Sequence, residues 1–214
     1  MWNDADIGQV LKAGLGLIGL MIVAIGAFLP MFSNNFVWDD QEFIVNNPGI
    51  RFIFPISHFF RTQGLPASGA IYPATGARPV TTMSLAIDYS IWRLDPFGYH
   101  LTNLLLHILC MIGIFLIAKN LWRNFVIGFV TAVLFALHPG HAEAVIAFLG
   151  RSDLMATLFI VGGFLIYLKE RDAVGVYKII FYSLSLISFA LAVFSKETGL
   201  VLFFILILYD FILS

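Results

Sequence analysis

The sequence predicts an all-α protein that crosses a membrane several times. Of its 214 residues, 60% are hydrophobic, and the charged residues are only 12 Lys and Arg and 13 Asp and Glu. So few charges cannot cover the surface of a water-soluble protein of this length. Apolar runs that approach the roughly 20 residues of a membrane-spanning helix recur along the chain. The formal net charge of −1 provides no basic surface, which excludes nucleic acid as a partner.

Six apolar segments predict the membrane helices. We expect them near residues 10–32, 99–118, 124–138, 154–168, 178–194 and 199–213. In an alternative assignment, 124–149 is one helix that breaks at His138 and Pro139. Residues 1–214 then form a single transmembrane domain. Because the chain stops directly after an apolar run, we expect it to be the amino-terminal part of a larger protein.

The long segment 33–98 between the first two predicted helices is expected to be a structured outer loop. Turn-forming residues such as Pro48 and Gly49 are interspersed with aromatic side chains, which favours a position on the membrane surface. Residues 80–94 fit a short amphipathic helix. The apolar side of this helix would consist of Met83, Ala86, Ile87 and Ile91.

Basic residues in the short loops predict the orientation, because they favour the cytoplasmic side. Five of the seven follow the second and the fourth segments: Lys119, Arg123, Lys169, Arg171 and Lys178. The other two are Arg151 and Lys196. We therefore expect a cytoplasmic N-terminus. Segment 33–98 would face the periplasm of a bacterial inner membrane or the lumen of the endoplasmic reticulum.

On this topology the candidate functional residues gather at the outer ends of the helices. The stretch FVWDDQEFIVNNP, residues 36–48, places Asp39 and Asp40 just outside the first helix. His100, Asn103 and His107 have the i, i+3, i+7 spacing of a polar stripe on the second helix. The remaining candidates are Arg78, His138, His141, Glu143, Arg151, Asp153, Lys196 and Glu197. Any chemistry is therefore expected on one face of the membrane.

Several of these residues also have purely structural interpretations. His138, His141 and Glu143 are residue types that bind zinc, but their spacing is not a recognised zinc signature. The histidines would alternatively cap helix ends and bond to loop carbonyls. Arg151 and Asp153 would pair with each other, and the two aspartates would form an Asx-type turn. No cofactor is required, and a divalent metal is left open.

Five motifs in order resemble one family. They are WDDQEFIVNNP (38–48), RPVTT (78–82), DPFGYHLTNLLLH (95–107), LHPGHAEAVIAFLGRSDL (137–154) and SKETG (195–199). Together they resemble the amino-terminal membrane part of the transmembrane and tetratricopeptide-repeat-containing O-mannosyltransferases and their bacterial relatives. That family belongs to the C-type membrane glycosyltransferases (GT-C). Its later membrane helices and its repeat domain lie beyond the resemblance.

The resemblance implies transfer of a sugar, mannose in the eukaryotic members, from a polyprenyl-phosphate donor to a Ser or Thr hydroxyl of a protein. The reaction would take place at the outer membrane surface and invert the anomeric configuration. Asp39 would accept the proton of the attacking hydroxyl, and Asp40 would orient the acceptor or bind a metal. The donor phosphate would be held by Arg78, Arg151 and Lys196, because cations stabilise charge on a leaving group.

Two other functions stay open on the sequence. The chain would be a non-catalytic membrane subunit or scaffold if it keeps the fold but lacks parts needed for turnover. It would be a transporter if the outer polar residues mark a permeation path, as ionisable residues inside membranes often do. The expected partners are the lipid-linked sugar, a protein acceptor, membrane lipid and further subunits.

Overall fold

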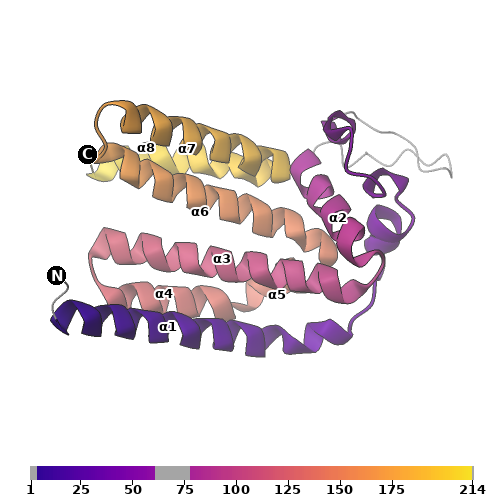
Figure 1. The fold of residues 1–214 in the computed structure, drawn as a ribbon, viewed down its shortest axis with the longest axis horizontal. Coiled ribbons are helices and arrows are strands. Elements are labelled where there is room, and N and C mark those ends of the chain that lie inside the picture. Colours follow the sequence, from indigo (N-terminus) through magenta and orange to yellow (C-terminus); the bar gives the residue numbers. More distant parts are fainter. Residues whose placement is uncertain (1–3, 61–77, 214) are drawn as a thin grey trace.

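The computed structural model describes residues 4–60 and 78–213, and helices dominate both ranges (Figure 1). The α-helices are α1 (Asp4–Phe28), α2 (Pro79–Trp92), α3 (Pro96–Trp122), α4 (Phe125–Leu137), α5 (Ala142–Ile146), α6 (Arg151–Arg171), α7 (Val176–Ser195) and α8 (Val201–Leu213). Shorter helical turns are η1 (Leu29–Ser33), η2 (Gln41–Val45), η3 (Pro48–Ile50), η4 (Ile56–Phe60), η6 (Pro139–His141), η7 (Phe148–Gly150) and η8 (Glu197–Leu200). No strand occurs in the described ranges, which confirms the predicted all-α class.

The long helices lie side by side in a bundle, with α2 across one end (Figure 1). Both described chain ends lie at the opposite end of the bundle. The end that carries α2 also gathers the end of α1, the start of α3, the end of α7 and the segment from η6 to η7. Motifs that are far apart in the sequence therefore meet there.

Four helical segments are long and apolar enough to cross a membrane: Gly14–Ser33, Pro96–Trp122, Phe148–Arg171 and Val176–Ser195. A fifth crossing is obtained if α4 and the segment Pro139–Ile146, which bend by 54° at their junction, form one broken span. This bend lies at the predicted break, because Pro139 cannot continue the helix. α8 has 13 residues, fewer than the roughly 20 that a spanning helix needs. The predicted number of six spans is therefore not confirmed.

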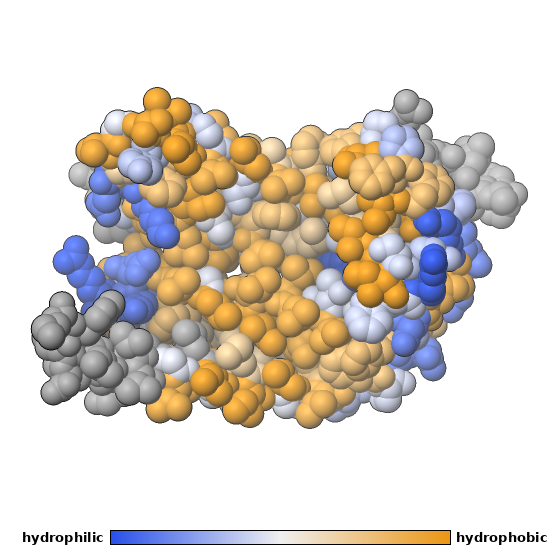
Figure 2. Space-filling model, viewed as in Figure 1, coloured by the Kyte–Doolittle hydropathy of each residue, from blue (hydrophilic) through white to orange (hydrophobic). Residues whose placement is uncertain are grey.

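The surface has the distribution expected of a membrane protein. Hydrophobic residues cover the flank of the bundle, and hydrophilic residues gather toward its two ends (Figure 2). Large apolar side chains on α7 and α8 are exposed, among them Ile179, Leu186, Phe203 and Phe204. A continuous apolar flank of this kind is typical of a surface that lies in lipid or packs against further helices.

Small residues and serines join the helices of the bundle. Ser188 donates a hydrogen bond from Oγ to the backbone oxygen of Phe159 at 2.8 Å, and Ser185 does the same to Gly163 at 3.1 Å. A Cβ on Gly163 would lie 2.7 Å from a methyl group of Leu202, so α6, α7 and α8 meet at this glycine. Close approach and hydrogen bonds across helices are the forces that associate helices in lipid.

The described parts of segment 33–98 pack onto the end of the bundle and form a hydrophobic core there. Its buried members are Ile44, Ile50, Phe59, Leu85, Ala86, Tyr99 and Phe148. α2 forms where an amphipathic helix was predicted, but its rotation differs. Ala86 is buried, whereas Ile87 and Ile91 are 43% and 64% exposed, because α2 turns Asp88 inward. The part of the expected outer loop at 61–77 lies outside the described residues.

Candidate functional site

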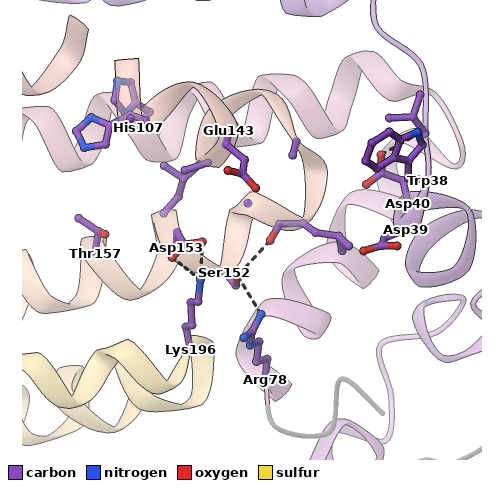
Figure 3. A pocket seen from close by; sticks show the side chains of 18 of the residues that line it. Trp38, Asp39, Asp40, Arg78, His107, Glu143, Ser152, Asp153, Thr157 and Lys196 are labelled. Atoms are coloured by element: carbon purple, nitrogen blue, oxygen red, sulfur yellow. Dashed lines mark hydrogen bonds and ion pairs between the residues drawn. The ribbon is translucent and has the colours of Figure 1, made fainter. Parts of the chain in front are cut away.

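A cavity of about 680 Å³ lies at the end of the bundle that carries α2 (Figure 3). Its walls come from residues 37–40, from Arg78 just before α2, from α3 and α4, from the segment from η6 to η7, from the start of α6 and from the loop after α7. The predicted site residues that line it are Asp39, Asp40, Arg78, His107, His141, Glu143, Asp153 and Lys196. Eight candidates from distant parts of the sequence thus share one cavity.

The two aspartates differ in their surroundings. Asp39 is exposed, and its carboxylate has no hydrogen-bond or ion-pair partner within residues 4–60 and 78–213. Asp40 is 5% exposed, and its Oδ2 accepts the backbone N–H of Val37 at 3.0 Å. Burial raises the pKa of Asp40; the Val37 hydrogen bond partly opposes this, and repulsion by Asp39 adds to it. Asp40 therefore closes a turn, and Asp39 presents a free carboxylate.

The turn that carries the aspartates has an unusual backbone. Trp38 has φ of 49°, in the left-handed region that bulky residues rarely adopt, and its side chain is 91% exposed. The backbone N–H of Asp40 bonds to the oxygen of Val37 at 3.0 Å, which closes the turn. Such strain is concentrated at functional sites. Trp38, Asp39 and Asp40, which form this turn, all line the cavity (Figure 3).

Two cations line the cavity, and each is held by a carboxylate. Lys196 Nζ lies 2.6 and 2.8 Å from the carboxylate oxygens of Asp153. Arg78, the residue before α2, donates to both carboxylate oxygens of Glu197 at 2.9 and 3.1 Å. The hydrogen bond from its own backbone N–H, and then that from Arg78, lower the pKa of the exposed Glu197. Glu197 itself does not line the cavity, but its pairing fixes the position of Arg78.

Another wall of the cavity consists of η6 and α5. His141 lies with Nδ1 2.7 Å from the backbone oxygen of Phe135, near the end of α4. The carboxylate of Glu143 points into the cavity (Figure 3) and has no partner in the described part of the chain. A Cβ on Gly150 would lie 2.5 Å from the backbone oxygen of Ala144, so the start of α6 packs directly on α5. This close approach fixes the wall relative to α6.

The metal hypothesis receives no support from this geometry. Within residues 4–60 and 78–213, no three His, Cys, Asp or Glu residues lie close enough to hold an ion. His141 uses one ring nitrogen for the carbonyl of Phe135, and Nδ1 of exposed His138 accepts the backbone N–H of Gly140 at 3.1 Å. Both contacts are of the kind expected if the histidines cap helix ends and bond to loop carbonyls instead of binding a metal. Among the described residues His138, His141 and Glu143 do not come together as a three-ligand cluster, and His138 does not line the cavity.

Arg151 is part of the protein interior and does not line the cavity. Its side chain is 0% exposed, and Nη1 lies 2.5 Å from Oδ2 of Asp88. Nε donates to Oδ1 of Asn103, and Nη2 donates to the backbone oxygen of Tyr99, both at 2.9 Å. The guanidinium is thus committed to α2 and α3. Arg151 is therefore not placed to bind the donor phosphate as the sequence suggested, and its ion-pair partner is Asp88 instead of the expected Asp153.

The predicted polar stripe of α3 turns inward and joins helices. His100 and His107 are fully buried, and their Nε2 atoms lie 3.3 Å from the backbone oxygen of Asn34 and 3.2 Å from that of Ala136. His100 does not line the cavity, whereas His107 does. His107 is eleven residues into α3, or ~16 Å along its axis at 1.5 Å per residue. The cavity therefore extends from the end of the bundle that carries α2 along α3 as far as His107.

Eleven further residues line the cavity and were not predicted as site residues; those with polar side-chain atoms are Trp38, Ser152 and Thr157. Thr157 lies four residues after Asp153, so both are on one side of α6, a spacing that the sequence does show. Ser152 lies within the GRSD motif, and its Oγ is 3.5 Å from Nη1 of Arg78. For Trp38 the sequence offered only its position beside the aspartates.

The chain is similar over most of its length to proteins named protein O-mannosyl-transferases. It is 30% identical over 200 residues to one from Caenorhabditis elegans, which covers 92% of this chain and 28% of that protein. It is 33% identical over 187 residues to TMTC1 of Homo sapiens, with coverage of 82% and 21%, and 30% identical over 179 residues to TMTC3 of Homo sapiens, with coverage of 82% and 19%. The chain thus spans between 19% and 28% of these relatives. No family model and no solved structure matches it.

Proposed function

Because this chain belongs to the family of transmembrane and tetratricopeptide-repeat-containing O-mannosyltransferases, we propose that its cavity is a glycosyltransferase site. It would transfer a mannose-like sugar from a polyprenyl-phosphate donor to a Ser or Thr hydroxyl of a protein. The observation that carries the proposal is the cavity itself. It unites a free carboxylate, Asp39, with two cations, Arg78 and Lys196, at one end of an apolar bundle.

In the proposed reaction Asp39 is the general base. The acceptor hydroxyl oxygen attacks the anomeric carbon from the face opposite the phosphate, and its proton passes to the Asp39 carboxylate. The bond between the anomeric carbon and the phosphate oxygen breaks, and the electron pair leaves with the polyprenyl phosphate. This displacement inverts the anomeric configuration. The exposed, unpartnered carboxylate of Asp39 suits this role, and the buried, hydrogen-bonded Asp40 supports the turn that presents it.

Arg78 and Lys196 are the residues that we assign to the donor phosphate. Negative charge grows on the phosphate as the sugar leaves, and fixed cations stabilise it in that state. Asp153 and Glu197 keep these cations in place before the donor binds, so neither long side chain has to be ordered by the ligand. The proposed phosphate site therefore has two cations instead of the three that the sequence suggested.

The position of the cavity agrees with a lipid-linked donor. An isoprenoid tail has to remain in lipid while its sugar meets an acceptor from the aqueous side. The cavity lies at the end of the bundle, close to the apolar flank, and reaches down to His107. We propose that this end faces the periplasm or the lumen, because the five basic loop residues lie toward the other end.

The test is sugar transfer by the protein at its full natural length. Radiolabelled polyprenyl-phosphate mannose and a Ser/Thr acceptor peptide would be supplied in detergent, with wild type compared with Asp39→Asn, Arg78→Gln and Lys196→Gln. We expect Asp39→Asn to lower the transfer rate by about 100-fold or more, because a positioned general base contributes ~10²–10⁴-fold to the rate. The matched control is Asp95→Asn, which changes an exposed carboxylate at the start of α3 that does not line the cavity.

The alternative that the chain is a non-catalytic scaffold predicts a different result. In that case wild type transfers no sugar from any polyprenyl-phosphate donor, or Asp39→Asn transfers it at the wild-type rate. The transporter alternative instead requires a path through the bundle. It would be favoured if radiolabelled sugar crossed sealed vesicles that contain the protein without becoming attached to a peptide.

A further inference from the structure

We propose that the wall formed by η6 and α5 is a subsite for the hydroxyl groups of the transferred sugar, with His141 and Glu143 as hydrogen-bond acceptors. This inference rests on the proposed function and adds a location and an orientation for the sugar. It assigns the donor phosphate to the side of Arg78 and Lys196, and the sugar ring to the side of α5.

The first observation is the tautomer of His141. A backbone carbonyl only accepts hydrogen bonds, so the contact of 2.7 Å with the oxygen of Phe135 places the hydrogen on Nδ1. In the neutral ring Nε2 then carries a lone pair. This nitrogen has no hydrogen-bond partner within residues 4–60 and 78–213. The ring packs against those of Phe135 and His107, at centroid distances of 4.4 and 5.9 Å, which hold its orientation.

The second observation is that Glu143 is the uncommitted carboxylate of this wall. Of the other cavity carboxylates, Asp153 is paired with Lys196 and Asp40 accepts the N–H of Val37. Asp39, which we assign to the chemistry, comes from a different element. Glu143 extends from α5 into the cavity between Asp153 and the aspartate turn (Figure 3). A carboxylate accepts hydrogen bonds in several directions, which suits neighbouring hydroxyls on one ring.

The third observation is the space beside these acceptors. Gly140, Ala144 and Ala147 line the cavity along the same wall, so no long side chain stands between a ligand and this surface. Gly150 is in close backbone contact with Ala144, and its N–H donates a hydrogen bond to the backbone oxygen of Ala147 at 3.1 Å, which attaches this wall to the start of α6. The wall is therefore both open to a ring and fixed in position.

The two sides of the cavity select different chemical groups. A phosphate carries only acceptor oxygens at neutral pH, and it is repelled by Glu143 and cannot donate to His141. Sugar hydroxyls can donate to both residues. Arg78 and Lys196 carry donors only and suit the phosphate. A hexose attached to a phosphate is therefore expected to bind in one orientation, with the phosphate at Arg78 and Lys196 and the sugar hydroxyls at His141 and Glu143.

A binding experiment tests the subsite without relying on turnover. The probes are polyprenyl phosphate and polyprenyl-phosphate mannose, titrated by isothermal calorimetry into the full-length protein in detergent. The variants are Glu143→Ala, which removes an exposed side chain, and His141→Phe, which keeps an aromatic ring against Phe135. The control is His138→Asn, which retains an acceptor for the N–H of Gly140 and changes an exposed residue outside the cavity.

We expect wild type to bind the mannose-bearing lipid more tightly than the bare lipid phosphate. Each variant should weaken binding of the mannose-bearing lipid by about tenfold, the value of a hydrogen bond to a charged or buried partner. Binding of polyprenyl phosphate should stay within twofold of wild type, and the control should retain both affinities. The thermal midpoint of each variant, measured in parallel, identifies any that do not fold.

Two results would overturn the proposal, and they are distinguishable from failure of the proposed function. The subsite is refuted if wild type prefers the mannose-bearing lipid and folded Glu143→Ala keeps that preference. It is also refuted if Glu143→Ala weakens both lipids equally, because the residue would then act on the phosphate or on the fold. If wild type binds neither lipid, the glycosyltransferase proposal itself fails and the subsite fails with it.

Discussion

Arg151 and Asp88 form an ion pair from which water is excluded, with side chains 0% and 6% exposed. Breaking a buried pair leaves one uncompensated charge, which costs more than the pair itself contributes. We therefore expect Arg151→Met to lower the free energy of unfolding by about 3–5 kcal/mol. The measurement is denaturant unfolding in detergent, followed by tryptophan fluorescence.

The exposed pair between Arg78 and Glu197 serves as the comparison. The Glu197 side chain is 64% exposed, so Glu197→Gln removes only a surface ion pair and the unfolding midpoint should stay close to the wild-type value. In the double variant Arg151→Met with Asp88→Leu, both buried charges disappear, and much of the lost stability should return. A double variant as unstable as Arg151→Met alone would show that the loss came from the hydrogen bonds to α3, and not from the unpaired charge.

Asp40 is expected to reduce the stability of the fold at neutral pH. Its pKa is raised by burial in the folded protein, so the folded state binds a proton to it more readily than the unfolded chain does. The contribution of Asp40 to the free energy of unfolding is most favourable below the pKa of about 3.9 that it has in the unfolded chain. This contribution is lost as the pH rises through the higher pKa of Asp40 in the folded protein. Asp40→Asn should therefore raise the unfolding midpoint at pH 7, and this gain should shrink toward pH 4.

The amide in this variant can still accept the N–H of Val37. A midpoint at pH 7 below that of wild type would contradict the expectation and would make Asp40 a purely structural residue. A more stable variant with reduced sugar transfer would show a carboxylate that is retained for function at a cost in stability.

The turn η8 is positioned by the close approach of one glycine to α7. A Cβ on Gly199 would lie 2.3 Å from the carbonyl carbon of Ala192 and 2.4 Å from the nitrogen of Val193, both backbone atoms that cannot move aside. Gly199→Ala should displace the loop that carries Lys196, lower stability by about 1–3 kcal/mol and weaken binding of polyprenyl phosphate. Unfolding and calorimetric titration measure the two effects.

A second glycine gives the matched control. The nearest atom to a Cβ on Gly162, within α6, is Oγ of Ser188 at 3.9 Å, so alanine fits there. Because alanine favours the helix interior by about 0.5–1 kcal/mol relative to glycine, Gly162→Ala should be neutral or stabilising. If both variants lost the same stability, close packing at Gly199 would not be the reason.

The helices were predictable because a long apolar run has few alternatives in lipid. The segments expected at 124–138 and 178–194 form as α4 (125–137) and α7 (176–195), and the break at His138 and Pro139 lies where proline requires it. The rotation of α2 was not predictable from its apolar stripe. Asp88 is turned inward by Arg151, which lies 63 residues later, and no local pattern encodes that contact.

The residues that line the cavity were predictable in part, because the order of the helices fixes which loops lie at the same end of the bundle. Topology alone places Asp39, Glu143, Asp153 and Lys196 at one end of the bundle, and the structure brings them into one cavity. Whether a charged residue at that end faces the cavity or the interior depends on packing. Arg151 and Lys196 looked equivalent in sequence, yet one is fully enclosed by α2 and α3 while the other faces the cavity.

The bundle has a chemical polarity along its axis. The described cavity residues lie at the end with α2, and the loops that follow α3 and α6 carry basic residues at the other end. A second polar cluster lies toward that other end. Tyr167 donates to Asp210 at 2.6 Å, and Arg171 lies 3.3 Å from the same carboxylate, which joins α6 to α8. This cluster holds helices together far from the cavity.

This polarity predicts which residues can be labelled from each side of the membrane. In a Cys110→Ala background, which removes the buried native thiol, single cysteines would replace exposed Glu197 and exposed Asp172. A membrane-impermeant maleimide added to intact cells, or to sealed microsomes from the lumenal side, should label Glu197→Cys. It should label Asp172→Cys only after permeabilisation, because the basic loop between α6 and α7 is expected in the cytoplasm. The reverse pattern would place the cavity on the cytoplasmic side, and an outer-surface transfer reaction would then have to be abandoned.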